Sequence, residues 1–308
     1  NADDPLCLQM ADYTRAERLS YVTMNPAHPL VKQHIMAGGQ AFVLEQGMNG
    51  HLITIYDKET HTPLLWTHLI PATVEGRAMH NVQNAMFAAA LAYNMRIGLE
   101  DIRQGLRTFD STFFQAPGRM NIYDEHPFRV ILDYAHNPAA VSAMCDLVDR
   151  FDVDGRRIVV LSAPGDRRDE DIREIADVAA GHFDYFICRC DDNRRGRGPD
   201  EVAVMLKNRL LEKGVSSDNI AIIPDEQEAT SEALQMAEAG DLILILGDNT
   251  TRAWKQIIYF KSGSPVVAPG KKSNTVQDLP DTMGFEMADD LEIISDERGV
   301  RIAREEGD

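Results

Sequence analysis

The spacing of hydrophobic and polar residues divides the chain into three regions. In residues 1–113, apolar and polar positions alternate in three runs separated by turn residues, which predicts an antiparallel meander. Before and after the meander, apolar residues recur every three or four positions, which predicts helices. Gly98 is expected to follow the C-cap of one of these helices. The expected strands are 40–45, 51–56 and 63–69, and the expected helices are 30–37, 81–96 and 100–108.

Residues 114–262 follow a different pattern, in which short and almost continuously apolar runs alternate with helical periods. This alternation predicts an α/β fold with a mostly parallel, doubly wound sheet. Unbroken apolar strands are typical of a sheet that is covered on both faces. The strands are expected at 129–133, 158–161, 185–188, 220–223 and 242–246, and the helices at 139–150, 170–180, 199–212, 226–239 and 251–259.

The two ends of the chain have a simpler character. Residues 263–308 begin with Pro, Gly and Ser and become acidic, which predicts a flexible tail. Docking of residues 291–294 onto another surface is the alternative. Residues 1–5 resemble the polar end of a strand whose apolar body is not among these 308 residues, so we expect the chain to begin inside a domain.

Composition narrows the classes of partner. The formal net charge is −18, which disfavours nucleic acids and anionic membranes because phosphate binding needs clustered basic residues. The acidity suits a cationic substrate such as arginine, although acidity that only maintains solubility is the simpler explanation of the charge. No apolar run is long enough to span a membrane and no secretory signal is present, so we expect a cytoplasmic protein.

The four cysteines point to structure rather than to metal binding. Cys188 and Cys190 lie in an apolar, strand-like run, where alternation places both sulfurs on one face. Cys7 and Cys145 are isolated, and no other pair of cysteines or histidines has the spacing of a zinc site. We therefore expect buried, reduced cysteines.

The sequence Asp-Tyr-Ala-His-Asn-Pro at 133–138 directly follows an expected strand. Ligands of open α/β sheets bind beyond the carboxyl ends of the strands, where the Asp133 carboxylate can accept hydrogen bonds from ribose hydroxyls. Asn137 and Pro138 have the residue types of an N-cap and a first helical residue. A helix start accounts for these two residues but not for Asp133 and His136.

Two further segments carry candidate nucleotide contacts. Arg119 follows Ala-Pro-Gly at the junction of the first two regions, where a hinge can bring an arginine onto a phosphate; a linker with a solvated arginine is the alternative. Asn81 and Asn84 are three residues apart and share one face of a helix start. Their amides can contact a base edge, while capping by Asn81 alone is the simpler interpretation.

Three polar loops follow further strands of the second region, at 164–169, 191–198 and 247–252. The first two contain glycine and alternating charges, which is typical of loops that approach phosphate or an acidic substrate. Solvated loops are the alternative for each one taken alone. Their common position at the carboxyl edge of one sheet favours a substrate site.

Together these segments resemble the Mur ligase superfamily and, within it, the cyanophycin synthetase family. The resemblance covers about residues 1–262 and rests on several independent motifs. The superfamily motifs are Asn-Ala-Asp-Asp-Pro at 1–5, His-Asn-x-x-Asn at 80–84, Pro-Gly-Arg at 117–119 and Asp-Tyr-Ala-His-x-Pro at 133–138. The stretches that carry the closer resemblance include Ile-Pro-Ala-Thr at 70–73, residues 99–109, Pro-Gly-Asp-Arg-Arg-Asp-Glu-Asp at 164–171 and the charged loop at 191–197.

The resemblance implies a fold and an activity. Residues 1–113 would be the later part of an ATP-binding central domain, and 114–262 would be a complete Rossmann-like C-terminal domain. The implied reaction uses ATP and Mg²⁺ to activate the side-chain carboxylate of aspartate in a polymer as an acyl phosphate, to which arginine is added. The full-length enzyme would be a homo-oligomer.

The resemblance also implies roles for individual residues. Asn81, Asn84, Arg119 and Asp133 would bind the nucleotide, with Asn84 near the adenine, Arg119 near the phosphates and Asp133 near the ribose. His80, Arg119 and His136 would line the catalytic cleft, and no metal ligands are assigned. The residues expected on the substrate side are Asp166, Arg167, Asp191, Asp192, Arg194 and Arg197.

The chain departs from the family in one respect. The family's Gly-x-x-x-x-Gly-Lys-[Ser/Thr] phosphate loop is not found in these 308 residues, so we expect them to turn over ATP weakly or not at all by themselves. Two alternatives stay open. The chain could belong to a related ligase of the muropeptide or folylpolyglutamate type, or it could be a non-catalytic module that binds the polymer or serves assembly.

Overall fold

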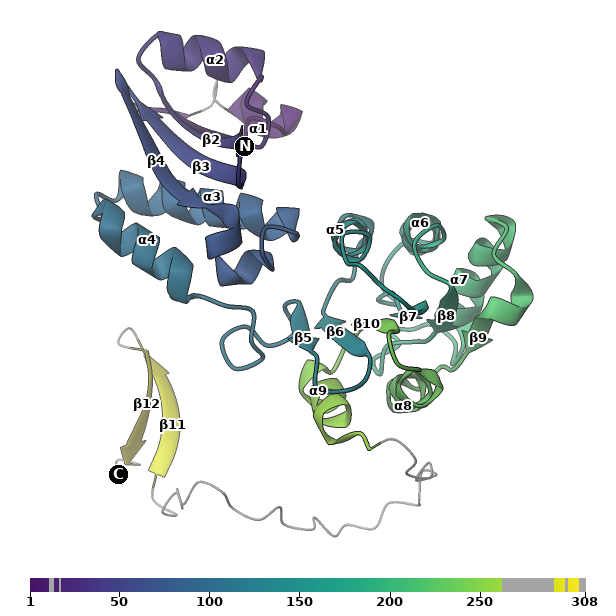
Figure 1. Ribbon diagram of the computed structural model, residues 1–308. Helices are drawn as coiled ribbons and strands as arrows, with labels where there is room; N and C mark the ends of the chain where they lie inside the picture. Colours follow the sequence, from purple (N-terminus) through teal and green to yellow (C-terminus); the bar gives the residue numbers. More distant parts are fainter. Residues whose placement is uncertain (11–13, 17, 262–290, 297–298, 305–308) are drawn as a thin grey trace. The chain divides into compact units, whose positions relative to one another are not determined.

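The computed structural model describes residues 1–308 except 11–13, 17, 262–290, 297–298 and 305–308. The chain divides into two compact units, Asn1–Ser264 and Pro265–Asp308. Each unit is described by itself, with the elements labelled in Figure 1. Among the described residues, no helix is long and apolar enough to cross a lipid bilayer.

A four-stranded sheet occupies the first part of the chain, in the order β1-β2-β3-β4. Strands β2, β3 and β4 form the expected antiparallel meander, and β1 adds a parallel edge strand beside β2. The sequence did not indicate β1, because four residues are too few to show a period. The strands are β1 Ser20–Thr23, β2 Gln40–Gly47, β3 Gly50–Asp57 and β4 Thr60–Trp66, and residues 67–69 and 71–73 form short 3₁₀ turns.

Helices cover both faces of this sheet (Figure 1). On one face Phe42 packs in a core with Met86, and on the other Val43 packs with Val31 of α2. The inward and outward side chains of β2 therefore belong to different cores. The helices are α1 Pro5–Gln9, α2 Pro29–Met36, α3 Met79–Asn94 and α4 Leu99–Thr108.

Two predictions about helix ends are wrong. Gly98 is the N-cap of α4 with an ordinary φ of −61°, while Arg96 is the left-handed residue that follows α3, with φ 65°. Asn81 does not cap α3, because the N-cap is Ala78 and the helix begins two residues before Asn81. The Asn81 amide instead donates to the Ala72 carbonyl oxygen at 2.7 Å, which ties the helix to the preceding turn.

A six-stranded sheet follows, in the order β5-β6-β10-β7-β8-β9. Five strands are parallel, as predicted, and β5 joins β6 as an antiparallel edge strand that the sequence did not indicate. The central β10 lies between β6 and β7, so the chain crosses over the sheet before it returns to the centre. The strands are β5 Asn121–Tyr123, β6 Arg129–Asp133, β7 Arg157–Leu161, β8 Tyr185–Cys188, β9 Ile220–Ile222 and β10 Leu242–Leu246.

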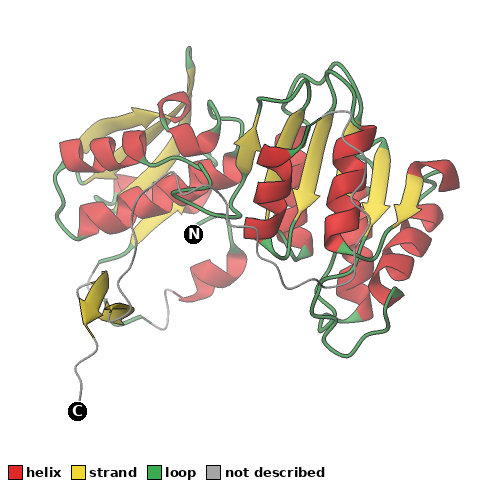
Figure 2. Cartoon of the chain, turned by 90° about the horizontal axis from the view of Figure 1, so that it is seen from below, coloured by secondary structure: helices red, strands yellow, loops and turns green. Residues whose placement is uncertain are grey.

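Alternate residues of each strand face different helical layers. Val159 and Leu161 pack in a core with α5, α6 and α7, whereas Ile158 and Val160 pack with α8 and α9. Figures 1 and 2 show this sheet between its two helical layers. Burial on both faces explains why these strands are uniformly apolar. The helices are α5 Pro138–Val148, α6 Asp169–Ala179, α7 Glu201–Glu212, α8 Glu226–Met236 and α9 Thr250–Tyr259.

Three of the four cysteines agree with the prediction of buried, reduced thiols. All four are free; Cys145, Cys188 and Cys190 are buried in the same core, whereas Cys7 is exposed, which differs from the prediction. Burial raises the pKa of the Cys188 thiol to about 12, which keeps it protonated and unreactive. Over the described part of the chain, no group of three or more His, Cys, Asp or Glu side chains is arranged to hold a metal ion.

The second unit contains an antiparallel pair of strands, β11 Leu291–Asp296 and β12 Gly299–Arg304. This differs from a tail without structure, which the composition of residues 263–308 predicted. Leu-Glu-Ile-Ile and Val-Arg-Ile-Ala carry β-branched residues that favour strands, and the surrounding acidic residues obscure this signal. Residues 262–290 lie outside the described residues.

An aspartate closes the amino-terminal edge of the six-stranded sheet. Asp241, directly before β10, is 3% exposed; it accepts hydrogen bonds from the Arg156 backbone at 2.6 Å, the Arg156 guanidinium at 2.7 Å and the Glu238 backbone at 3.0 Å. Burial alone would raise the pKa of Asp241, but the bonds from Arg156 and Glu238 outweigh burial and lower it. The carboxylate thus joins the start of β10 to the start of β7.

Asp241→Asn should destabilise the protein by about 2 kcal/mol at pH 7. Because the folded-state pKa is depressed, the stabilisation by Asp241 is complete above the unfolded pKa of about 3.9 and is lost as the pH falls below it. Urea unfolding of both proteins at pH 7 and below pH 4 measures the difference, which should shrink in acid. Asp218→Asn, at an exposed position in the 3₁₀ turn before β9, is the control. Equal differences at both pH values would contradict this account.

Candidate functional site

A polar crevice lies at the carboxyl edge of the six-stranded sheet, where four parallel strands end. Each strand contributes the residues that directly follow it, as expected for a ligand site in an open α/β sheet. His136 and Asp191 are sequence-predicted site residues that line this crevice. The lining residues are Tyr134, Ala135 and His136 after β6, Ser162, Ala163 and Pro164 after β7, Arg189 and Asp191 after β8, and Leu246, Gly247 and Asp248 at the end of β10.

Arg189 is the largest fully buried side chain in the described structure and forms the floor of the crevice, with 1% exposure. Its guanidinium donates to the Leu246 carbonyl oxygen at 2.6 Å and to the Cys190 carbonyl oxygen at 2.9 Å. It also pairs with Asp191 at 3.3 Å and with Glu226 at 3.4 Å. One buried cation therefore joins the ends of β8 and β10 to the start of α8.

Glu226 is fully buried and organises the loop after β10. Its carboxylate accepts the backbone N–H of Asp248 at 2.7 Å and that of Asn249 at 3.2 Å. It also pairs with Arg252 of α9, whose other guanidinium nitrogen donates to Asp192 at 2.7 Å. The loops after β8 and β10 are thus linked through a continuous series of charged groups.

Asp248 differs from the other carboxylates of the crevice. Asp191 accepts a hydrogen bond from Ser162 at 2.6 Å, but no hydrogen bond or ion pair is found for the Asp248 carboxylate among the described residues. Desolvation raises the pKa of Asp248, and the nearby carboxylates of Asp191 and Glu226 add to the effect more than Arg189 opposes it. A cation bound beside Asp248 would relieve this cost.

Asp133 at the end of β6 holds two backbone turns. One carboxylate oxygen accepts the Met120 N–H and the other accepts the Ala135 N–H, both at 2.7 Å. Burial raises the pKa of Asp133, and these hydrogen bonds partly counter it. Asn137 caps α5 by accepting the Ala140 N–H at 2.9 Å, with Pro138 in the first turn, so this prediction is confirmed.

Arg119 lies on a rigid turn rather than on a free linker. Gly118 and Met120 on either side have left-handed φ values of 69° and 51°. The buried Asn121 amide accepts the Gly118 N–H at 2.7 Å and donates to the carbonyl oxygens of Ser111 at 2.8 Å and Ala116 at 2.9 Å. The Arg119 guanidinium itself is exposed, 5.9 Å from the centre of the Tyr134 ring. This turn presents a cation close to the start of the crevice.

The two charged loops expected on the substrate side contact each other. Asp166 pairs with Arg195 at 2.8 Å, and the Arg197 guanidinium donates to the Gly165 carbonyl oxygen at 3.0 Å. Arg167 and Arg194 are exposed. The structure therefore brings the loops together, but it uses Arg197 within the protein.

The predicted residues of α3 lie in a different hollow. Asn81 and Asn84 line an apolar hollow between α3 and α4, and Asn84 donates to the Asn81 side-chain oxygen at 3.1 Å, so the two amides share one face as predicted. Burial lowers the pKa of His80, the second residue of α3, and Asp146 opposes this effect. A common crevice that includes Asn84 together with Asp133 and the loops stays a prediction.

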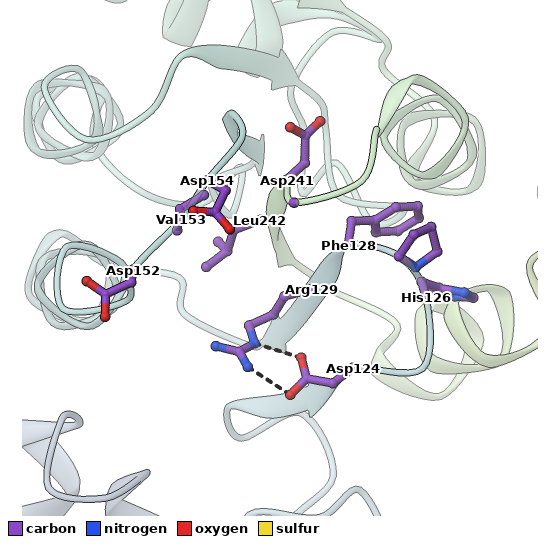
Figure 3. A pocket seen from close by; sticks show the side chains of 11 residues that line it. Asp124, His126, Phe128, Arg129, Asp152, Val153, Asp154, Asp241 and Leu242 are labelled. Carbon is purple, nitrogen blue, oxygen red and sulfur yellow. Dashed lines mark hydrogen bonds and ion pairs between the residues drawn. The ribbon is translucent and has the colours of Figure 1, made fainter.

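A second polar hollow, shown in Figure 3, lies at the opposite edge of the sheet, where β6 and β10 begin. Asp124, Asp152, Asp154 and Asp241 surround it, and Arg129 pairs with Asp124 at 2.6 Å. None of the candidate residues from the sequence lines this hollow. The carboxyl edge therefore combines the sequence motifs with the geometry of a ligand site, and the amino edge does not.

Several residues at this edge escaped the sequence interpretation. Ser162, Arg189 and Asp248 line the crevice, and Glu226 and Arg252 form ion pairs at the same edge. The segment 247–252 was expected as a polar loop at this edge, but nothing singled out its second residue. Arg189 was considered only as the residue between two cysteines. Its position between the last apolar residue of a strand and an acidic loop is the signal that could have indicated a buried cation.

Comparison with known proteins identifies the family of the domain that contains the crevice. Residues 118–249 match the family described as "Mur ligase, glutamate ligase domain". These residues belong to the Mur ligase family. Over 257 residues, 83% of this chain, the sequence is 38% identical to the cyanophycin synthetases of Trichormus variabilis and of Nostoc sp.. The chain spans 28% of the length of each of these synthetases.

More distant relatives share the Mur ligase fold. A UDP-N-acetylmuramoyl-L-alanyl-D-glutamate–2,6-diaminopimelate ligase of Clostridium acetobutylicum is 30% identical over 171 residues, 54% of this chain and 33% of that protein. The solved bifunctional folylpolyglutamate synthase/dihydrofolate synthase of Yersinia pestis, complexed with AMPPNP and a Mn ion, has a TM-score of 0.52, 23% identity, and coverage of 78% of this chain and 52% of that chain. The latter likeness shows the fold alone.

Asn121→Ala should lower the free energy of unfolding by about 3 kcal/mol, because it leaves the Gly118 N–H and two carbonyl oxygens without their partner. Urea denaturation measures this loss. Asn219→Ala, at an exposed position before β9, is the matched control and should have little effect. An Asn121→Ala protein as stable as the control would show that this amide does not hold the turn that carries Arg119.

Proposed function

We propose that this chain is part of an ATP-dependent amide-bond ligase that adds arginine to the side-chain carboxylate of aspartate in a polymer. The observation that carries the proposal is the crevice at the carboxyl edge of a Mur ligase domain, with an unpaired carboxylate at Asp248. The similarity to cyanophycin synthetases supports the polymer as the acyl donor. A cytoplasmic location and a homo-oligomeric full-length enzyme stay predictions.

The reaction requires activation, because a free carboxylate is a poor acyl donor. ATP supplies the phosphoryl group that makes the carboxylate an acyl phosphate, and the amine then displaces phosphate to form the amide. Arg119 fits a phosphate contact, since its guanidinium is exposed on a rigid turn and a planar fork can contact two phosphate oxygens. Asp133, although it holds two backbone N–H groups, keeps acceptor capacity on each oxygen for ribose hydroxyls.

Mg²⁺ is assigned no ligands from the described residues, which contain no suitable cluster of acidic side chains or histidines. In phosphoryl-transfer sites this ion is bound largely by phosphate oxygens and water, with one or two carboxylates. Asn84 would lie near the adenine, Asn81 would also belong to the nucleotide site, and His80 and His136 would line the cleft. These roles come from the motif positions and remain proposals.

The charge of the crevice favours a cationic amino acid. Arg189 and Arg252 are both engaged in ion pairs, with Asp191, Asp192 and Glu226 as their partners. Among the described residues no cation therefore pairs with Asp248, although it lines the same crevice. A guanidinium or ammonium group of the substrate would complete the charge balance. A neutral or acidic side chain would leave the carboxylate unpaired.

Release of ADP by the complete protein product of the reading frame that includes these residues tests the function. With an aspartate-containing polymer, arginine should stimulate release, whereas diaminopimelate and glutamate should not. Stimulation by diaminopimelate or glutamate instead would assign the chain to a muropeptide-type or folylpolyglutamate-type ligase. Polymer binding without any amino-acid-dependent ADP release would favour the non-catalytic module.

Asp248→Asn should lower kcat/KM for arginine by about 30-fold, because loss of one partner of a charge pair leaves the other uncompensated. Citrulline, which is similar in shape to arginine but uncharged, should be a poor substrate for both proteins. Its kcat/KM should be the same with and without the substitution. Asp218→Asn is the matched control. A parallel loss with arginine and citrulline would show that Asp248 does not recognise the cation.

A further inference from the structure

Arg197 joins the two charged loops of the carboxyl edge. Its Nε donates to the Gly165 carbonyl oxygen at 3.0 Å, and one Nη donates to the Arg167 carbonyl oxygen at 2.8 Å. The other Nη pairs with Asp169 at 2.7 Å and with Glu201 at 2.8 Å. Four of the five N–H groups of the guanidinium are therefore used within the protein.

These contacts span three elements. Gly165, Arg167 and Asp169 belong to the loop after β7 and the start of α6, whereas Glu201 begins α7. Arg197 itself lies in the loop after β8, and its side chain is only 18% exposed. Most of the guanidinium is thus engaged by groups of the protein, which leaves little of it to contact a substrate.

The backbones of the two loops also touch directly. A Cβ atom at Gly165 would overlap the carbonyl oxygen of Arg194, so glycine permits this close approach. A second tie lies beside it, where both carboxylate oxygens of Asp166 accept from Arg195 at 2.8 Å. Arg195 and Gly196 adopt left-handed φ values of 49° and 92°, which turn the chain back toward the first loop.

We propose that Arg197 is a positioning residue that joins the loops 164–169 and 191–198 into one preformed wall of the amino-acid site. This replaces the role of substrate contact that the sequence suggested for Arg197. Pro164 and Asp191 line the crevice, and they lie at the starts of the two joined loops. The identity of the wall as the amino-acid side rests on the proposed function, whereas the joining of the loops rests on the contacts alone.

The geometry of the fork, rather than its charge, performs this function. A lysine has a single nitrogen with three donors and cannot reach the Gly165, Arg167 and Glu201 acceptors together. Arg197→Lys should therefore fail to replace arginine although the charge is kept. If Arg197 instead attracted the substrate through its charge, lysine would restore most of the activity that Arg197→Ala loses.

The first measurement needs no enzymatic activity. Hydrogen exchange of Arg197→Lys should be at least about 10-fold faster than wild type in peptides covering 164–169 and 193–198, because their shared contacts are lost. Arg209→Lys is the matched control, since Arg209 also makes a complete set of ion pairs, with Asp177 and Glu212, but lies in α7 away from these loops. Unchanged exchange in the two loops would overturn the proposal.

The second measurement uses steady-state kinetics to distinguish a positioning role of Arg197 from a general loss of folding or activity. In the arginine-dependent ADP assay, Arg197→Lys should raise KM for arginine about 10-fold, while KM for ATP and kcat at saturating arginine change by less than about twofold. Gly165→Ala should have the same effect, with Gly181→Ala as its control because nothing lies within 4 Å of a Cβ at Gly181.

The double variant tests whether Gly165 and Arg197 act through the same loop contact. If both residues act by joining the same loops, Gly165→Ala combined with Arg197→Lys should raise KM little more than either change alone. Multiplicative effects would show that Arg197 acts independently of the loop contact and would contradict the proposal. Faster exchange without any change in KM would show that Arg197 joins the two loops but that the amino acid binds elsewhere. That result would contradict the proposed amino-acid site but not the loop contacts.

Discussion

The carboxyl edge of the six-stranded sheet depends on one buried cation. Arg189 follows β8, where it pairs with Asp191 and Glu226 and donates to the last carbonyl oxygen of β10. Removing one member of such a pair would leave a charge buried without a partner, at a cost of about 3–5 kcal/mol. The ends of β8 and β10 are therefore joined to the start of α8 by contacts that are hidden from solvent.

Charged residues of the same types in the sequence therefore have different functions at this site. Glu226 uses its carboxylate to hold the backbone of Asp248 and Asn249, and Arg252 carries the connection outward to Asp192. Arg197 holds two loops together from the side. Because these groups neutralise one another, the carboxylate of Asp248 is left without a hydrogen bond or ion pair among the described residues, and the proposed cationic substrate would pair with it.

The sequence predicted the sheet more completely than the site. The ranges 185–188 and 242–246 were correct to the residue, because unbroken apolar runs bounded by charged loops leave little ambiguity. The edge strands β1 and β5 escaped because short strands gain their order from a neighbour rather than from their own pattern. In the site, Asp191 and His136 were found through motifs, but Glu226 was not, since its partner Arg189 is far away in sequence and meets it only after folding.

A crystal structure of the protein with arginine and a non-hydrolysable ATP analogue tests the central claim most directly. The guanidinium of arginine should lie within about 3 Å of a carboxylate oxygen of Asp248, above the buried Arg189. Arginine bound instead in the acidic hollow at the opposite edge of the sheet, beside Asp152 and Asp154, would contradict the account.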